Sequence, residues 1–149
     1  MMDKEDLIVR HENAEIILMK AKEKWNYDRH YNWFPLVSEE LACNFDWFFI
    51  MEHFMEEQYH RVLKLLFKGS DAIYYVPLYS IEQSIYSFDN NQFETFRNYC
   101  TEYACFSENV SWIYYRSHEG TVSFAGTILN EAQRILSSKK ESWNDLYYK

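Results

Sequence analysis

Glycine and proline are scarce in this chain of 149 residues, which holds 3 and 2 of them. This composition excludes collagen-like and linker-rich chains and argues against long disordered segments. The 3 cysteines are an odd number without a CxxC pair, which argues against a disulfide framework or a zinc knuckle. Neither GxGxxG nor GxxxxGK[ST] occurs, so glycine-rich phosphate loops are excluded.

Long hydrophobic runs are missing as well. The densest apolar stretch, 45–55, is interrupted by Asp46, Glu52 and His53, so no window is apolar enough to span a bilayer. The first residues lack the basic and apolar regions of a secretory signal. We therefore expect a cytoplasmic protein with reduced thiols and no membrane segment. Its length predicts a single domain over 1–149.

Aromatic residues make up 19% of the chain, and their spacing with the aliphatic residues alternates between helical and strand periods. The pattern predicts helices over 3–27, 38–67, 80–88, 92–106 and 128–138. A break at Asn44 or Phe45 would divide the second of these into two helices, and the segment 45–50 taken alone is also compatible with a strand. We expect an α+β fold in which about five helices pack against a small antiparallel or mixed sheet, formed by the C-terminal hairpin 110–126 and the strand 72–77.

The net charge of −8 and the pI of about 5.1 argue against nucleic-acid binding. The excess acidity lies in the middle of the chain, because no Lys or Arg occurs between Arg29 and Arg61 or between Lys68 and Arg97. These two windows hold ten acidic residues, and with the three intervening basic residues they account for −7 of the total charge. The rest of the chain is nearly neutral, with 13 acids and 12 bases.

Acidic residues interleaved with aromatic ones suit a basic protein partner, since carboxylates steer the encounter and rings anchor the complex. An alternative is that the acids only keep an aromatic-rich surface soluble. The sequence predicts a partner-binding surface that consists of Glu39, Glu40, Asp46, Trp47, Glu52, Glu56, Glu57 and Tyr59.

A metal or ligand site is the alternative function. On a continuous helix, His53, Glu57 and His60 would share one face, and Glu57-x-x-His60 has the spacing of carboxylate-bridged metal bundles. No second copy of this spacing and no HExxH motif occurs, which favours a solvated or partner-binding face. We accordingly expect no cofactor, no metal and no catalytic residue.

His118 is the other candidate for chemistry. It lies in the sequence Ser117-His118-Glu119-Gly120, which predicts a hairpin turn. A nucleophilic pair of His118 with Cys100 or Cys105 is conceivable, with Glu119 or Glu108 orienting the ring. No local family signature accompanies these residues, so buried structural cysteines and a turn histidine are the favoured interpretation.

In size, acidity, aromatic content and lack of a catalytic signature, the chain resembles the bacterial immunity proteins of contact-dependent inhibition and related polymorphic toxin systems. Members of this class do not share one fold, so the resemblance covers overall composition and assigns no residue. It implies a cognate basic, nuclease-type toxin domain as partner. Carboxylates would then plug the toxin's active site in place of nucleic-acid phosphates, or block the groove beside it. We expect such a protein to be a monomer or a homodimer.

Overall fold

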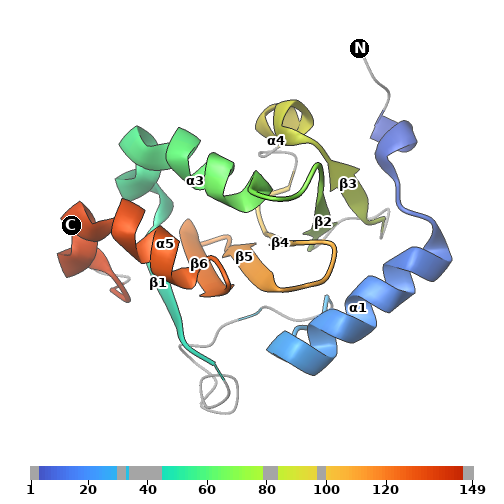
Figure 1. Ribbon diagram of the computed structural model, residues 1–149, viewed down its shortest axis with the longest axis horizontal. Coiled ribbons are helices and arrows are strands. Elements are labelled where there is room, and N and C mark those ends of the chain that lie inside the picture. The colour runs from blue at the N-terminus through green and yellow to red at the C-terminus, as the bar shows by residue number, and fades with distance from the viewer. Residues whose placement is uncertain (1–3, 30–32, 34–44, 79–83, 97–99, 146–149) are drawn as a thin grey trace.

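The computed structural model describes residues 4–29, 33, 45–78, 84–96 and 100–145, and its centre is a six-stranded antiparallel sheet (Figure 1). The strand order is β1-β6-β5-β4-β2-β3. The strands are β1 (Trp47–Met51), β2 (Ile73–Pro77), β3 (Tyr86–Phe88), β4 (Tyr103–Phe106), β5 (Trp112–Arg116) and β6 (Thr121–Gly126). The α+β class expected from the sequence is confirmed, with a larger sheet than expected.

Helices cover both faces of this sheet. The α-helices are α1 (His11–Trp25), α3 (Tyr59–Phe67), α4 (Asn90–Phe96) and α5 (Leu129–Ile135). Short 3-10 helices span η1 (Lys4–Leu7), η2 (Glu52–Gln58) and η3 (Ser137–Ser142). In Figure 1, α3 and α5 lie side by side, and α1 lies apart from them. No helix of the described residues is both long and apolar enough to cross a membrane.

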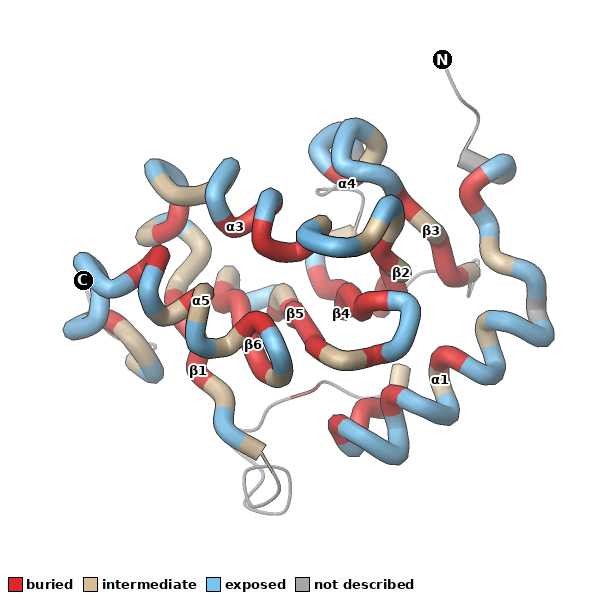
Figure 2. The backbone as a smooth tube through the Cα atoms, in the orientation of Figure 1, coloured by how far each residue is buried: buried red, intermediate tan, exposed pale blue. Residues whose placement is uncertain are grey.

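Two hydrophobic clusters fill the spaces on the two sides of the sheet. One contains Tyr114 of β5 together with buried residues of α3, α4 and α5, and the other contains Tyr115 of β5 with buried residues of α1. Consecutive strand residues point to opposite faces, so strands covered on both faces have no polar side. Figure 2 accordingly shows the central strands as buried along most of their length.

The segments next to the chain ends cover the edges of the sheet. At the β1 edge, the Phe49 N–H donates to the Asn144 side-chain oxygen at 2.9 Å, and the Asn144 N–H donates to the Phe49 carbonyl at 2.8 Å. At the β3 edge, the Val9 N–H donates to the Ile85 carbonyl at 2.8 Å, and Ile8 forms a bridge with Tyr86. These contacts satisfy backbone groups that would otherwise invite pairing with another chain.

The expected helix over 38–67 is confirmed only at its C-terminal end, and the alternative of a strand within 45–50 is the one that the structure shows. Residues 47–51 form β1, η2 follows it, and the α-helix begins only at Tyr59; residues 38–44 lie outside the described part. Phe48 pairs with Phe124 of β6, and their rings stack with centroids 5.1 Å apart. This long-range pairing outweighs the local helical spacing of the apolar residues.

The expected helices over 80–88 and 92–106 also need correction. Residues 86–88 form the edge strand β3, and the second segment divides into α4 and the strand β4. Cys105 therefore lies in a central strand and not on a helix.

The strand at 72–77 and the final helix are confirmed with small shifts of their bounds. The first helix is present but shorter than expected: α1 begins at His11 and not at residue 3, because Lys4–Leu7 form the separate turn η1 and Ile8 pairs with Tyr86. The hairpin over 110–126 is also present, with Gly120 at a φ of +84° in its turn.

Candidate functional site

Charged residues gather at one end of the sheet. β1 ends at Met51 opposite Thr121, where β6 begins, and β5 ends at Arg116 opposite Tyr103, where β4 begins. The residues that flank these strand ends are Glu52, Glu102, Arg116, His118 and Glu119, which we call the charged end.

An ion pair between Glu52 and Arg116 lies in the middle of the charged end. Nε of Arg116 is 2.7 Å from Oε2 of Glu52, and Nη1 of Arg116 donates to the carbonyl oxygen of Thr101. Burial opposes the charge of Arg116, but the hydrogen bond and the negative charge of Glu52 outweigh it, so the pKa of Arg116 is raised above its ordinary value. The positive charge of Arg116 is therefore already neutralised by Glu52.

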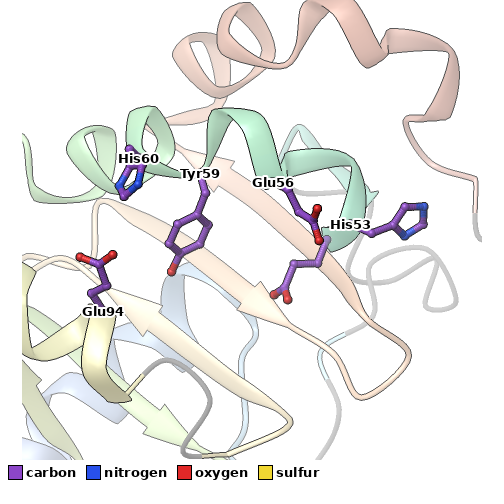
Figure 3. Close-up of a pocket in the computed structure, with 6 residues that line it drawn as sticks. His53, Glu56, Tyr59, His60 and Glu94 are labelled. Atoms are coloured by element: carbon purple, nitrogen blue, oxygen red, sulfur yellow. The ribbon is translucent and has the colours of Figure 1, made fainter.

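An open pocket of about 360 Å³ lies next to this ion pair. It is lined by Glu52, His53, Glu56, Tyr59, His60 and Glu94. Figure 3 shows Glu94 of α4 facing His60 across the pocket, with the Tyr59 ring between Glu56 and Glu94 and the His53 ring directed away. None of these described lining residues is Lys or Arg. With Glu52 paired to Arg116, the carboxylates of Glu56 and Glu94 give the pocket a negative potential.

The predicted partner-binding residues do not all lie together. Glu52, Glu56 and Tyr59 line the pocket, and Glu57 is exposed on the same η2 helix. Asp46 and Trp47 lie at the opposite end of β1, about 13 Å from Met51 at the usual rise per strand residue. Glu39 and Glu40 lie outside the described residues. Glu94 lines the pocket but was not among the residues chosen from the sequence, although it belongs to the second window without basic residues.

The expected shared face of His53, Glu57 and His60 is wrong. His53 and Glu57 belong to the 3-10 helix η2, while His60 belongs to α3. Residues four apart in a 3-10 helix are rotated by about 120° relative to each other, so His53 and Glu57 point in different directions. Within the described part of the chain, the only group of three residues with metal-ligating geometry is Glu102, His118 and Glu119.

Glu102 is the central residue of that group, and its side chain has no solvent exposure. Its Oε1 accepts hydrogen bonds from the backbone N–H of His118 at 3.0 Å and from Nδ1 of the same residue at 2.7 Å. Its Oε2 accepts a hydrogen bond from the hydroxyl of Tyr115. Glu102 thus fixes both the hairpin turn and the orientation of the His118 ring.

The other ring nitrogen of His118 faces a second carboxylate. Nε2 lies 3.1 Å from Oε1 of Glu119, and both side chains are nearly half exposed. The hydrogen bond to Glu102 raises the pKa of His118 above its ordinary value, and the negative charge of Glu119 contributes in the same direction. The structure therefore holds an imidazole between a buried and an exposed carboxylate.

Glu102 was not identified from the sequence, since it lay inside an expected helix. Its partners lie on β5 and in the following turn, at least 13 positions away, and no local pattern marks such a contact.

Cys105 does not pair with His118. Its side chain lies in the core on the α3 and α5 side of the sheet, whereas Tyr115, which contacts Glu102, packs on the α1 side. Burial raises the pKa of the Cys105 thiol, so this sulfur stays protonated and weakly nucleophilic. Sγ of Cys100 lies 2.8 Å from the carbonyl oxygen of Leu78. These positions favour a structural role for both cysteines.

No protein-family model, curated protein or solved structure matches this chain.

Proposed function

We propose that this chain is an acidic protein-binding module that neutralises a cognate basic toxin domain in the cytoplasm, as an immunity protein does. The observation that carries the proposal is the pocket between η2, α3 and α4, which three carboxylates line and to which no described Lys or Arg contributes. Such a pocket attracts an ammonium or guanidinium group and repels a phosphate backbone.

The ion pairing of the three pocket carboxylates favours binding of a cation from the partner. Glu52 is paired with Arg116, whereas Glu56 and Glu94 form no ion pair with any described residue. A Lys or Arg side chain of the partner would supply the missing positive charge. The Tyr59 ring lies between these two carboxylates (Figure 3) and offers an aromatic face to the same cation.

This arrangement favours binding over catalysis. A basic toxin domain that acts on nucleic acid has a positive groove for phosphates. The carboxylates that line the pocket are complementary to such a groove and would exclude the substrate. We propose no enzymatic activity for the chain and expect a monomer or a homodimer.

The test uses the domain encoded by the neighbouring open reading frame, with its association measured by surface plasmon resonance at low and physiological salt. The variant Glu56→Gln/Glu94→Gln removes two charges from the pocket and leaves the Glu52–Arg116 pair intact. We expect it to slow association, most strongly at low salt, because long-range attraction is screened over roughly 8 Å at physiological ionic strength.

The matched control is Glu12→Gln/Glu23→Gln, which removes two exposed charges from α1 on the other side of the sheet. It should change the association rate much less than the pocket variant. Replacing Tyr59 by Leu should instead increase the dissociation rate and cost on the order of 2–4 kcal/mol of binding if the ring anchors the complex. The proposal would be contradicted if both charge variants slowed association equally, or if the association rate did not depend on the salt concentration.

A further inference from the structure

The hairpin turn after β5 presents a histidine ring in a fixed orientation. Oε1 of Glu102 is 2.7 Å from Nδ1 of His118 and 3.0 Å from the backbone N of the same residue. A carboxylate oxygen accepts hydrogen bonds, so Nδ1 carries the proton and Nε2 is the nitrogen left to bind a cation. A fully buried carboxylate thus selects which side of the ring faces the solvent.

The surroundings of Nε2 require positive charge. Nε2 lies 3.1 Å from Oε1 of Glu119, and the His118 side chain is 49% exposed. A nitrogen lone pair and a carboxylate oxygen repel each other at this distance unless a proton or a metal ion lies between them.

We propose that His118 Nε2 and Glu119 bind a divalent transition metal ion of the Zn²⁺ type, with Glu102 as the positioning residue. Imidazole and carboxylate ligands suit Zn²⁺, which binds nitrogen and oxygen at about 2.1 Å. Two such ligands in a tetrahedral shell lie about 3.4 Å apart, so the observed 3.1 Å needs a shift of only a few tenths of an ångström.

Glu102 gives the site the outer contact that metal-bound histidines use. Ligating imidazoles almost always donate their second N–H to a carboxylate or a carbonyl oxygen, which fixes the tautomer and raises ligand basicity. Here the buried carboxylate of Glu102 accepts this hydrogen bond from His118 Nδ1 and another from the Tyr115 hydroxyl. When the metal replaces the proton, the Nε2–H bond breaks, the Nε2–metal bond forms, and the proton passes to the solvent. Water molecules or a partner's side chain fill the remaining coordination positions.

This site is independent of the proposed toxin binding. Its ligands lie in the turn between β5 and β6 and do not line the pocket of Glu56 and Glu94.

The experiment titrates Zn²⁺ into the full chain after treatment with EDTA and desalting, in competition with a chromogenic zinc indicator. We expect one saturable site that His118→Ala abolishes and that Glu119→Gln weakens by about 10-fold or more. The matched control is Glu12→Gln, which removes an exposed carboxylate of α1 and should leave the affinity unchanged.

A second measurement distinguishes metal binding at His118 Nε2 from protonation of the same nitrogen. The ¹⁵N shift of His118 Nε2 should change from that of an imidazolium to that of a metal-bound nitrogen when Zn²⁺ is added. Glu102→Gln should weaken Zn²⁺ binding by about 10- to 100-fold through loss of the positioning contact, with a melting curve to check folding. If Glu102→Gln unfolds the chain, Glu119→Gln still provides the test, because the Glu119 side chain is 43% exposed. An unchanged imidazolium signal, or Zn²⁺ binding that survives His118→Ala, would overturn the proposal.

Discussion

Oε2 of Glu52 lies 2.7 Å from Nε of Arg116, and this ion pair connects the first residue of η2 to the last residue of β5 across 64 positions of sequence. The same junction contains a backbone hydrogen bond of 2.7 Å from the Glu52 N–H to the carbonyl of Gly120. The charged end is therefore anchored to the sheet at two points. Glu52, which these contacts hold in place, also forms part of the wall of the acidic pocket.

Arg116→Met is expected to destabilise the fold modestly. It leaves Glu52 without its partner and removes the hydrogen bond to the Thr101 carbonyl. Because both charged groups are partly exposed, we expect a coupling energy with Glu52→Gln of about 1 kcal/mol in a double-mutant cycle of urea unfolding. Arg134→Met serves as the control, since it breaks an exposed pair with Glu131 on α5. It should cost less than Arg116→Met, because an exposed ion pair contributes little to stability. Equal losses in the two variants would show that the Glu52 junction contributes nothing specific.

Phe124→Ala and Ile135→Ala should each destabilise the protein by about 2–5 kcal/mol, because both remove buried volume from the same cluster. The Phe124 ring stacks on Phe48 with centroids 5.1 Å apart and meets Tyr114 edge-on at 5.4 Å. Chemical denaturation measures the loss. Met19→Ala on the exposed side of α1 is the control and should stay within about 0.5 kcal/mol of the original protein. A loss below about 0.5 kcal/mol at both core positions would contradict the assigned core.

The sequence predicts strands well where a turn signal separates them and poorly where the spacing of aromatic residues also fits a helix. β5 and β6 are separated by Gly120 in a left-handed conformation, a signal that is local and readable. β4 has four buried residues in a row, and its aromatic spacing matches a helix equally well. β3 is a three-residue edge strand whose partners, Tyr75 and Ile8, come from distant segments. Such strands depend on pairing that periodicity does not encode.

The candidate site follows the same division. Charge counting along the chain indicated Glu52, Glu56 and Tyr59, which line one pocket. It could not separate them from Trp47, because the assumed helix concealed a strand that carries Trp47 to the other end of the sheet. Glu102 was missed because its contacts with Tyr115 and His118 arise from neighbouring strands and a turn. A buried carboxylate is identifiable only once the residues that surround it are known.

Gly126→Ala should be strongly destabilising, by more than about 2 kcal/mol. Gly126 has a φ of +88°, and an added Cβ would lie 2.4 Å from the Ser111 carbonyl oxygen and 2.7 Å from Cα of Trp112. Backbone strain of about 1–2 kcal/mol therefore adds to a clash with backbone atoms that cannot rotate away.

Gly69→Ala tests the backbone strain without a steric clash. Gly69 has a φ of +76°, but an added Cβ would meet no atom within 4 Å. We expect a cost of about 1–2 kcal/mol there, measured by the same thermal and urea unfolding curves. Equal stability of the Gly126→Ala and Gly69→Ala variants would contradict the close contact between the β5 backbone and Gly126.

High pH should unfold the protein cooperatively through its buried tyrosines. Tyr75, Tyr103 and Tyr114 form a row across β2, β4 and β5, with ring centroids 4.6 Å and 6.4 Å apart along it. Burial raises the pKa of all three hydroxyls, mainly because the phenolate anion would lose its hydration. The unfolded chain releases these protons near pH 10, so it binds fewer protons than the folded chain above that pH. Stability from this source is therefore fully present below about pH 10 and falls as the pH rises further.

Stopped-flow absorbance of tyrosinate after a jump to high pH tests this expectation. The buried row should ionise in a slow phase with the same rate as the loss of the far-ultraviolet circular dichroism signal. Tyr103→Phe supplies the control, because it removes one buried hydroxyl and keeps the ring between Tyr75 and Tyr114. It should reduce the amplitude of the slow phase and shift the unfolding midpoint to higher pH, since one fewer proton is released on unfolding. Complete ionisation of the tyrosines while the circular dichroism stays native would mean that water reaches this row, and would contradict its place in the core.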